Sequence, residues 1–249
     1  MDKHCILLLF SLLLLGSRTF CQSPYRLSLT VDVPISANAI GFLAASAMLS
    51  TTKKLPPADS ILVFNTQKIN LLDRSAVKQN SRASGYASDA CMFVSATLPL
   101  LHLINTNSRK DFGKVAAMGA EAFMLNLGIT NFVKELASRR RPLLYNPEVP
   151  MAKKLKKDNF KSFFSGHTST VATMSFFFAK TYSDYNPNSK YKPLVWSTSA
   201  LFPAVTGFLR YKAGKHFWTD ILTGYAVGAL CGLAVPYLHT AALQFSSQP

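Results

Sequence analysis

Apolar stretches recur along the whole chain and are separated by polar segments that contain Gly, Pro, Lys and Arg. They lie at residues 35–49, 92–104, 115–133, 170–179, 193–209 and 221–238. Ala, Leu, Met and Phe dominate these stretches, and most of them are too long for strands, so the pattern favours helices. Alternating polar and apolar positions never form a run long enough for a sheet. The sequence therefore predicts an all-α fold, a helical bundle of about six helices.

The length and polarity of these helices bear on whether they span a membrane. A span needs about 20 apolar residues, and several of the stretches are shorter. The stretch 115–133 contains Glu121, and an acidic side chain in such a helix should face the bundle interior. The stretch 35–49 is rich in Ala, Ser and Asn, which suits both close helix packing and a helix that does not cross. We expect a bundle that is embedded in a membrane or associated with one.

Residues 1–21 have the features of a secretory signal peptide. A short basic start precedes an apolar block of about eleven residues, which is too short for a span, and small residues follow it. We expect cleavage after Cys21, with an uncleaved anchor helix as the alternative. The chain beyond shows no internal repeat or low-complexity linker. Cys91 and Cys231 lie in apolar segments without CxxC spacing and are expected to be buried thiols.

The charge balance points to an anionic partner. Lys and Arg total 27 against 12 Asp and Glu, a formal net charge of +15, which suits phosphate esters, phospholipid headgroups or nucleic acid. No finger, recognition helix or basic strand interleaved with aromatic residues is present, so nucleic acid is not expected. A Lys-rich link at residues 152–161 is interpreted as a solvated loop, with attraction of anionic lipid as the alternative.

Three polar clusters stand at the ends of the predicted helices. The first contains Lys134, Arg141 and Pro142. Proline disfavours helical conformation in the residue before it, so the third helix is predicted to end at Arg141. Lys134 and Arg141 are seven residues apart, about two helical turns, so both cations are expected on one face, where they could grip one anion. Basic residues that merely extend from a helix end are the structural alternative.

The second cluster is Ser162 to Thr170, with the sequence SFFSGHTST, before the fourth helix. Small polar residues at a helix start leave backbone N–H groups free, and the helix dipole favours an anion there. Gly166 allows close approach of a ligand to the backbone. His167 could donate a proton to a leaving oxygen. An ordinary Ser or Thr cap beside an incidental His is the alternative.

The third cluster lies between the last two helices and contains Arg210, Lys215, His216 and Asp220. His216 and Asp220 are four residues apart, about one helical turn, so the carboxylate can reach an imidazole nitrogen. Such a contact would fix the tautomer and leave the other nitrogen as a nucleophile. A structural His–Asp pair is the alternative, but two cations crowded into the same segment favour an anion pocket.

The ordered series K-x6-RP, SGH and R-x5-H-x3-D resembles the type 2 phosphatidic acid phosphatases (PAP2), a superfamily that also holds bacterial acid phosphatases and vanadium haloperoxidases. The resemblance covers roughly residues 85–240, so we divide the chain into residues 1–21 (signal peptide), 22–84 (N-terminal helix and loop region) and 85–240 (phosphatase domain). It implies a phosphatase that needs no metal or other cofactor and forms a phosphohistidine intermediate.

The resemblance also implies a role for each matching residue. His216 would attack phosphorus, Asp220 would orient it, and His167 would protonate the leaving group and then activate water. The groups that would hold the phosphate oxygens are Lys134, Arg141, Ser165, Gly166 and Arg210. Two positions depart from the family pattern: Phe164 replaces the usual Pro and Leu209 the usual Ser. Neither change removes a reactive group.

The leading hypothesis is a cell-envelope phosphatase acting on a phospholipid or isoprenoid phosphate or diphosphate. We expect it in the inner membrane with its active site facing the periplasm, which is the arrangement that a cleaved signal peptide gives if the stretch 35–49 does not cross. If all six helices span, the site faces the cytoplasm instead. A soluble periplasmic acid phosphatase of the same superfamily is the alternative enzyme, and a haloperoxidase is disfavoured by the short chain. A phospholipid-binding membrane protein without turnover is the non-enzyme alternative. The sequence does not predict the oligomeric state.

Overall fold

The computed structural model describes residues 23–53, 57 and 64–240, and the described part is all-α, with one isolated bridge between Tyr25 and Thr240. The expected signal peptide lies outside the described residues. The long helices of the described part are α2 (Leu29–Thr52), α5 (Arg82–Thr97), α6 (Phe112–Ala137), α8 (Gly166–Tyr185), α9 (Lys192–Lys212) and α10 (Trp218–Leu238). Two short helices, α4 (Leu71–Arg74) and α7 (Met151–Lys154), accompany them. The predicted bundle of about six helices is confirmed.

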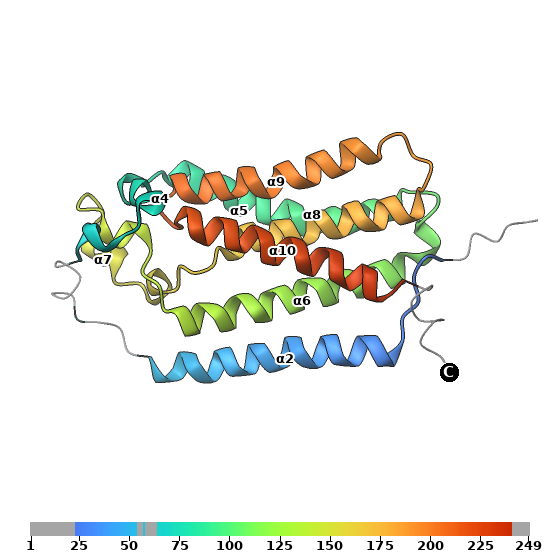
Figure 1. Cartoon of the computed structure of the whole chain (residues 1–249), viewed down its shortest axis with the longest axis horizontal. Coiled ribbons are helices and arrows are strands. Elements are labelled where there is room, and N and C mark those ends of the chain that lie inside the picture. The colour runs from blue at the N-terminus through green and yellow to red at the C-terminus, as the bar shows by residue number, and fades with distance from the viewer. Residues whose placement is uncertain (1–22, 54–56, 58–63, 241–249) are drawn as a thin grey trace, which may run out of the picture.

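Helix α8 is the centre of the bundle and contacts α5, α6, α9 and α10, while α2 packs along the outer side of α6 (Figure 1). The helices lie nearly side by side, so their ends gather at the two ends of the bundle. One end, which we call the α7 end, holds the starts of α5, α8 and α10 and the ends of α2, α6 and α9 (Figure 1). The opposite end holds Tyr25 and is called the Tyr25 end.

Glycines allow α10 to lie against the backbone of α8. They recur every four residues at Gly224, Gly228 and Gly232, and therefore share one face of the helix. A Cβ atom at Gly228 would lie 2.1 Å from the carbonyl oxygen of Ser169. The same substitution would place Cβ of residue 224 at 2.6 Å from the carbonyl oxygen of Ser165, just before α8, and Cβ of residue 232 at 2.3 Å from that of Thr173. This stripe of small residues fixes the distance between the two helices that carry the second and third clusters.

Helix α2 is the most exposed of the long helices, but ion pairs hold it to the bundle at both ends. At the α7 end, Lys53, which follows α2, pairs with Glu135 of α6. The Asp32 carboxylate of α2 lies 2.7 Å from Nε2 of His239, which follows α10. Glu121 of α6 lies 3.3 Å from the same nitrogen, so this acidic side chain faces the interior as expected. Among the described residues, α2 and α10 are the helices long and apolar enough to cross a membrane.

The apolar stretch 92–104 is not a single helix, contrary to the sequence pattern. Helix α5 begins ten residues earlier and ends at Thr97, and a 3-10 helix follows (Leu98–Leu103). Pro99 accounts for the change, because its ring is tolerated only in the first turn of a helix. The break turns His102 into the core, where its ring nitrogens lie 2.8 Å from Ser108 Oγ and 2.9 Å from Thr181 Oγ1. His102 thus has a packing role.

Candidate active site

All three clusters meet at the α7 end, although they come from five separate parts of the fold. Lys134 stands in the last turn of α6 and Arg210 in the last turn of α9. His167 is the second residue of α8. His216 lies in the loop between α9 and α10, and Asp220 lies in the first turn of α10.

The helix end in the first cluster differs from the prediction. Helix α6 ends at Ala137, because Ser138 adopts a left-handed conformation with φ of 43°. Arg141 is therefore extended and outside the helix, and the expectation of two cations on one helical face was wrong. The chain instead turns back, and the Arg141 guanidinium pairs with Asp158 at 2.7 Å. Lys134 and Arg141 still act on a common group, since after burial, the largest cause, both cations lower the pKa of His216.

His216 is held by a loop rather than by a helical turn, because α10 begins only at Trp218. Gly214 shapes this loop with φ of +66°, and a Cβ atom there would lie 2.1 Å from the carbonyl oxygen of Gln79. His216 is completely buried, and its Nδ1 lies 3.5 Å from Oδ2 of Asp220. The expected proximity of the two side chains is present, with a geometry set by the loop.

Asp220 is fixed by a network that the sequence did not reveal. Its Oδ2 accepts hydrogen bonds from Ser162 Oγ at 2.6 Å and from the backbone N–H of Phe217 at 2.9 Å. Arg139 pairs with Asp220 through one guanidinium nitrogen and with Asp73 through the other, the latter at 2.7 Å. Arg139 was visible as part of an Arg triplet, but Asp73 stands in no motif and comes from the distant helix α4.

A second carboxylate without a motif contacts His167. Asp89 of α5 has its Oδ1 2.8 Å from Nε2 of His167. The same oxygen accepts a hydrogen bond from Arg210 at 3.2 Å. With Nε2 facing Asp89, the carboxylate fixes the orientation of the imidazole and links it to an arginine of the third cluster.

Ser165 and Gly166 open helix α8 beside Lys134. The Ser165 hydroxyl accepts a hydrogen bond from the backbone N–H of Thr168 at 3.4 Å, so Ser165 is the N-cap. A Cβ atom at Gly166 would lie 3.2 Å from Cγ2 of Thr130 and 3.5 Å from the Lys134 ammonium nitrogen. Glycine thus keeps the space beside this ammonium and the start of the helix open.

Several buried nitrogens at this place have no hydrogen-bond partner among the described residues. They are Nε of Arg141, Nε of Arg210 and both ring nitrogens of His216. Burial, and then the nearby cations of Arg141, Arg210 and Lys134, hold the pKa of His216 well below its ordinary value of 6.5. Unsatisfied buried donors and crowded cations are both unfavourable, and an anion with several oxygens would relieve both. The geometry is therefore that of an oxyanion site beside a neutral imidazole.

The two departures from the family pattern lie beside this site. Phe164 is buried at 2% exposure and packs edge to face with Phe163 at 6.1 Å between ring centroids. Leu209 is half-buried on α9, next to Arg210. Both are apolar packing residues, and the polar groups described above are all retained.

Comparison with known proteins gives one family. The model of the PAP2 superfamily matches residues 117–244. A search of curated proteins gives no match. Among solved structures, the chain is similar to the first transmembrane PAP2 type phosphatidylglycerolphosphate phosphatase from Bacillus subtilis, with 20% sequence identity and a TM-score of 0.49. That match covers 88% of this chain and 98% of the other. Because the family model spans more than half of the chain, this protein belongs to the PAP2 superfamily and is a phosphatase of the PAP2 type.

Proposed function

We propose that the protein hydrolyses a lipid phosphate or diphosphate ester in the cell envelope, without a metal ion, through a phosphohistidine intermediate. The observation that carries the proposal is the group of buried, unpartnered nitrogens on Arg141, Arg210 and His216. Phosphoryl transfer demands little covalent chemistry from a protein and depends on positioning and on stabilisation of negative charge. Lys134, Arg141 and Arg210 supply that charge around a single imidazole.

In the first step, Nε2 of His216 attacks phosphorus and the bond between phosphorus and the leaving oxygen breaks. Nε2 is assigned because Nδ1 is the nitrogen that faces Asp220. The pair of electrons from the broken bond stays on the leaving oxygen, which takes a proton from His167. Asp220 stabilises the positive charge that develops on His216.

In the second step, water attacks the phosphorus of the phosphohistidine. His167, now neutral, accepts a proton from this water, and the bond between phosphorus and His216 breaks. The products are the alcohol, or the shorter phosphate, and inorganic phosphate, and both histidines return to their starting forms. Ser165 and the backbone N–H of Gly166 hold phosphate oxygens at the start of α8.

The exposed apolar surface of the bundle supports a lipid substrate and a membrane location. Large hydrophobic side chains are exposed along α2, α9 and α10, including Met48 at 73%, Leu201 at 63% and Leu230 at 67%. Such a surface is suited to lipid rather than to water. In this setting the α7 end lies at one membrane face, where the headgroup of a lipid can reach the site while its chains remain in the bilayer.

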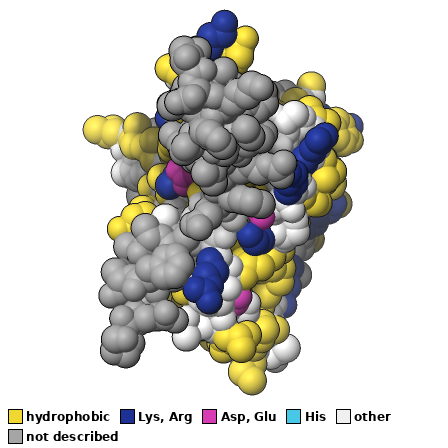
Figure 2. All heavy atoms as spheres, turned by 90° about the vertical axis from the view of Figure 1, so that its right-hand side faces the viewer, with side chains coloured by type: hydrophobic (Ala, Val, Ile, Leu, Met, Phe, Trp, Pro, Cys, Tyr) yellow, Lys and Arg dark blue, Asp and Glu magenta, His cyan; other side chains and the backbone are white. Residues whose placement is uncertain are grey.

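We further propose that the α7 end faces the outside of the inner membrane. Basic residues of the opposite end, including Arg109, Lys110, Lys190 and Lys192, would then lie inside, in agreement with the positive-inside rule. Figure 2 looks onto this Tyr25 end and shows Lys and Arg side chains scattered across it, with hydrophobic side chains on its flanks. The Lys-rich link at residues 152–161 lies at the α7 end and runs against the same rule in this orientation, whereas Lys134, Arg141 and Arg210 of that end are accounted for by phosphate binding.

Phosphate release by the purified protein in excess EDTA tests the proposal. We expect turnover of a long-chain lipid phosphate in detergent micelles that exceeds turnover of a small soluble ester. His216→Ala should abolish release, and Lys190→Gln, at the Tyr25 end, should leave it unchanged. Brief reaction with labelled substrate should give an acid-labile, alkali-stable phosphoenzyme in the parent protein and none in His216→Ala. Full activity of His216→Ala would refute the mechanism, and a preference for the soluble ester would favour an acid phosphatase.

A further inference from the structure

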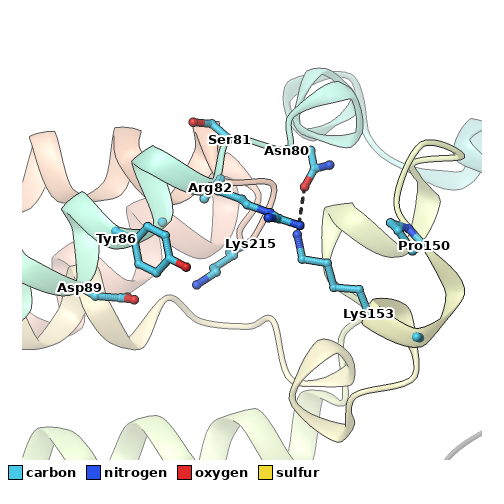
Figure 3. A pocket seen from close by; sticks show the side chains of 11 residues that line it. Asn80, Ser81, Arg82, Tyr86, Asp89, Pro150, Lys153 and Lys215 are labelled. Carbon is cyan, nitrogen blue, oxygen red and sulfur yellow. Dashed lines mark hydrogen bonds between the residues drawn. The ribbon is translucent and has the colours of Figure 1, made fainter.

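A cavity of about 450 Å³ opens at the α7 end, beside the candidate active site. Figure 3 shows that its wall is built from the start of α5, the segment around α7 and the loop between α9 and α10. Its lining residues are Asn80, Ser81, Arg82, Gly85, Tyr86, Asp89, Pro150, Ala152, Lys153, Ala213 and Lys215. None of these side chains reacts or holds the transferred phosphate in the proposed reaction.

The cavity adjoins the side of the site where a leaving group must lie. Asp89 is part of its wall and also contacts His167, the proposed proton donor to the leaving oxygen. In phosphoryl transfer the attacking and leaving atoms are roughly in line with phosphorus, so the leaving group points away from His216 and toward its proton donor. A leaving group that extends past His167 and Asp89 therefore enters this cavity.

The wall of the cavity is strongly basic. Arg82, Lys153 and Lys215 line it, against the single carboxylate of Asp89. Within the described part of the chain, none of these three cations has a carboxylate within ion-pair distance. Lys153 reaches only the side-chain oxygen of Asn80, at 3.5 Å (Figure 3).

Neighbouring carboxylates compensate this positive charge only in part. The Asp89 carboxylate is already engaged by Arg210 at 3.2 Å and by His167 at 2.8 Å. Lys215 is half-buried, and burial followed by the charge of Arg210 lowers its pKa. Cations that are partly desolvated and lack a carboxylate bind an anionic group more strongly than freely hydrated ones do.

We propose that this cavity binds a second phosphate group, carried by the leaving group of the substrate. The inference rests on the proposed function and narrows its substrate class. The preferred substrates are lipid diphosphates, in which the second phosphate is attached directly, or lipid phosphomonoesters whose headgroup contains a phosphodiester. Arg82, Lys153 and Lys215 are specificity-determining residues, whereas Lys134, Arg141 and Arg210 hold the phosphate that is transferred.

Two matched pairs of substrates test this assignment. Farnesyl monophosphate is compared with farnesyl diphosphate, and phosphatidic acid with phosphatidylglycerol phosphate of the same acyl chains. In each pair the second member carries an additional phosphate in the leaving group, accompanied in phosphatidylglycerol phosphate by an additional glycerol. The double variant Arg82→Gln/Lys153→Gln removes two cations from the exposed side of the cavity and leaves the catalytic groups in place. We expect kcat/KM to fall about tenfold for the second member of at least one pair and less than twofold for the first.

The pair that responds identifies the source of the second phosphate. A selective loss on the diphosphate indicates direct attachment, and one on phosphatidylglycerol phosphate indicates a headgroup phosphodiester. Equal losses on both members of each pair, or no loss, would overturn the cavity assignment while the proposed function stands. Absence of turnover on all four substrates by the parent protein would overturn the proposed function and this inference with it. The matched control Lys190→Gln should leave all four rates unchanged.

Product-like inhibitors provide a second readout that does not depend on lipid presentation. Inorganic pyrophosphate can occupy the site and the cavity together, whereas inorganic phosphate fills only one of them. We expect pyrophosphate to inhibit the parent protein at a concentration about tenfold lower than phosphate does. The double variant should lose that difference, and an unchanged ratio would count against the cavity as the second binding position.

Discussion

Asp220 illustrates how much of the proposed chemistry depends on a single side chain. Its carboxylate faces Nδ1 of His216 and is held by Ser162, Phe217 and Arg139. Asp220→Asn preserves the shape of the side chain but removes the charge that would stabilise a positive imidazole. We expect kcat to fall by roughly 10²- to 10⁴-fold, measured as phosphate release from a lipid phosphate in EDTA.

A companion variant separates the charge of Asp220 from its position. Ser162→Ala removes one hydrogen bond to the carboxylate and leaves its charge intact, so kcat should fall only about tenfold. If Ser162→Ala and Asp220→Asn lost the same activity while their melting temperatures stayed unchanged, Asp220 would contribute to kcat through its position rather than through its charge.

Burial of His216 also affects stability, and the sign follows from its lowered pKa. The folded protein holds this imidazole neutral at pH values where the unfolded chain, with a pKa near 6.5, binds a proton. Stability therefore rises with pH between the folded and unfolded pKa values and is lost as the pH falls below about 6.5. The slope is about 1.4 kcal/mol per pH unit for this group. Residue 216 cannot titrate in His216→Gln. The melting temperature of this variant should therefore fall less than that of the parent protein when the pH is lowered from 6.5 to 5.

Other groups also titrate in that range, so the relevant quantity is the difference between the two proteins. If the melting temperatures of the two proteins fell by the same amount between pH 6.5 and pH 5, His216 would not be held neutral by the fold. A smaller loss in His216→Gln would agree with an imidazole whose pKa is lowered by burial and then by Arg141, Arg210 and Lys134, so that it stays a neutral nucleophile.

At the level of residues, the sequence could predict those groups whose chemistry shows in short spacings. His216 and Asp220, four positions apart, do lie close in space. Asp73 and Asp89 could not be predicted, because single carboxylates in ordinary helices carry no local signal. Their roles arise only when α4 and α5 are placed against the α7 end, where Asp73 reaches Arg139 and Asp89 reaches His167.

Among the elements, the contact between α8 and α10 sets the distance between the second and third clusters. Gly228→Ala would put a methyl group 2.1 Å from the carbonyl oxygen of Ser169, and the helices would have to move apart. We expect a loss of about 1–3 kcal/mol, seen as a drop of several degrees in melting temperature in detergent, together with reduced activity.

Gly41 of α2 provides the matched control. A Cβ atom there meets nothing within 4 Å, so only the backbone preference of the helix changes. Gly41→Ala should be neutral or raise stability by up to about 1 kcal/mol, because alanine loses less conformational entropy in a helix than glycine does. Equal destabilisation by the two substitutions would show that the stripe on α10 is not a tight contact.

The same elements show why helix positions are easier to predict than helix ends. Each apolar stretch lies in a long helix or continues from one, because burial of apolar side chains decides where a helix forms. The ends depend on single residues whose conformation the pattern does not reveal. Ser138, a non-glycine residue with φ of 43°, ends α6 four residues before Pro142, where the sequence had predicted the break. Gly214 places His216 in a loop in a similar way.

At the scale of the molecule, the exposed apolar side chains of α2, α9 and α10 predict firm attachment to a membrane. We expect the protein to remain with the membrane fraction after osmotic shock and an alkaline carbonate wash, and to be released by detergent. A soluble acid phosphatase would instead appear in the shock fluid. Immunoblotting of the fractions, with activity measured in parallel, distinguishes the two.

The direction of the helices ties the position of the active site to that of residue 23. Helices α2 and α6 run in the same direction, since Asp32 lies beside His239 at the Tyr25 end and Lys53 pairs with Glu135 at the other end. If α2 crosses the membrane, residue 23 and the active site lie on opposite sides. An outward active site therefore requires residue 23 inside, whereas cleavage of an exported signal peptide would place it outside and the site inside.

Labelling of introduced cysteines in intact cells decides between these arrangements. Lys78→Cys places a thiol on an exposed position of the α7 end, and Lys190→Cys places one at the Tyr25 end. With the proposed outward site, a membrane-impermeant maleimide should label Lys78→Cys, while Lys190→Cys should react only after the membrane is permeabilised. The parent protein gives the background from its own cysteines. The reverse pattern would place phosphate release inside the cell and would agree with an exported, cleaved N-terminal segment, because residue 23 would then lie outside.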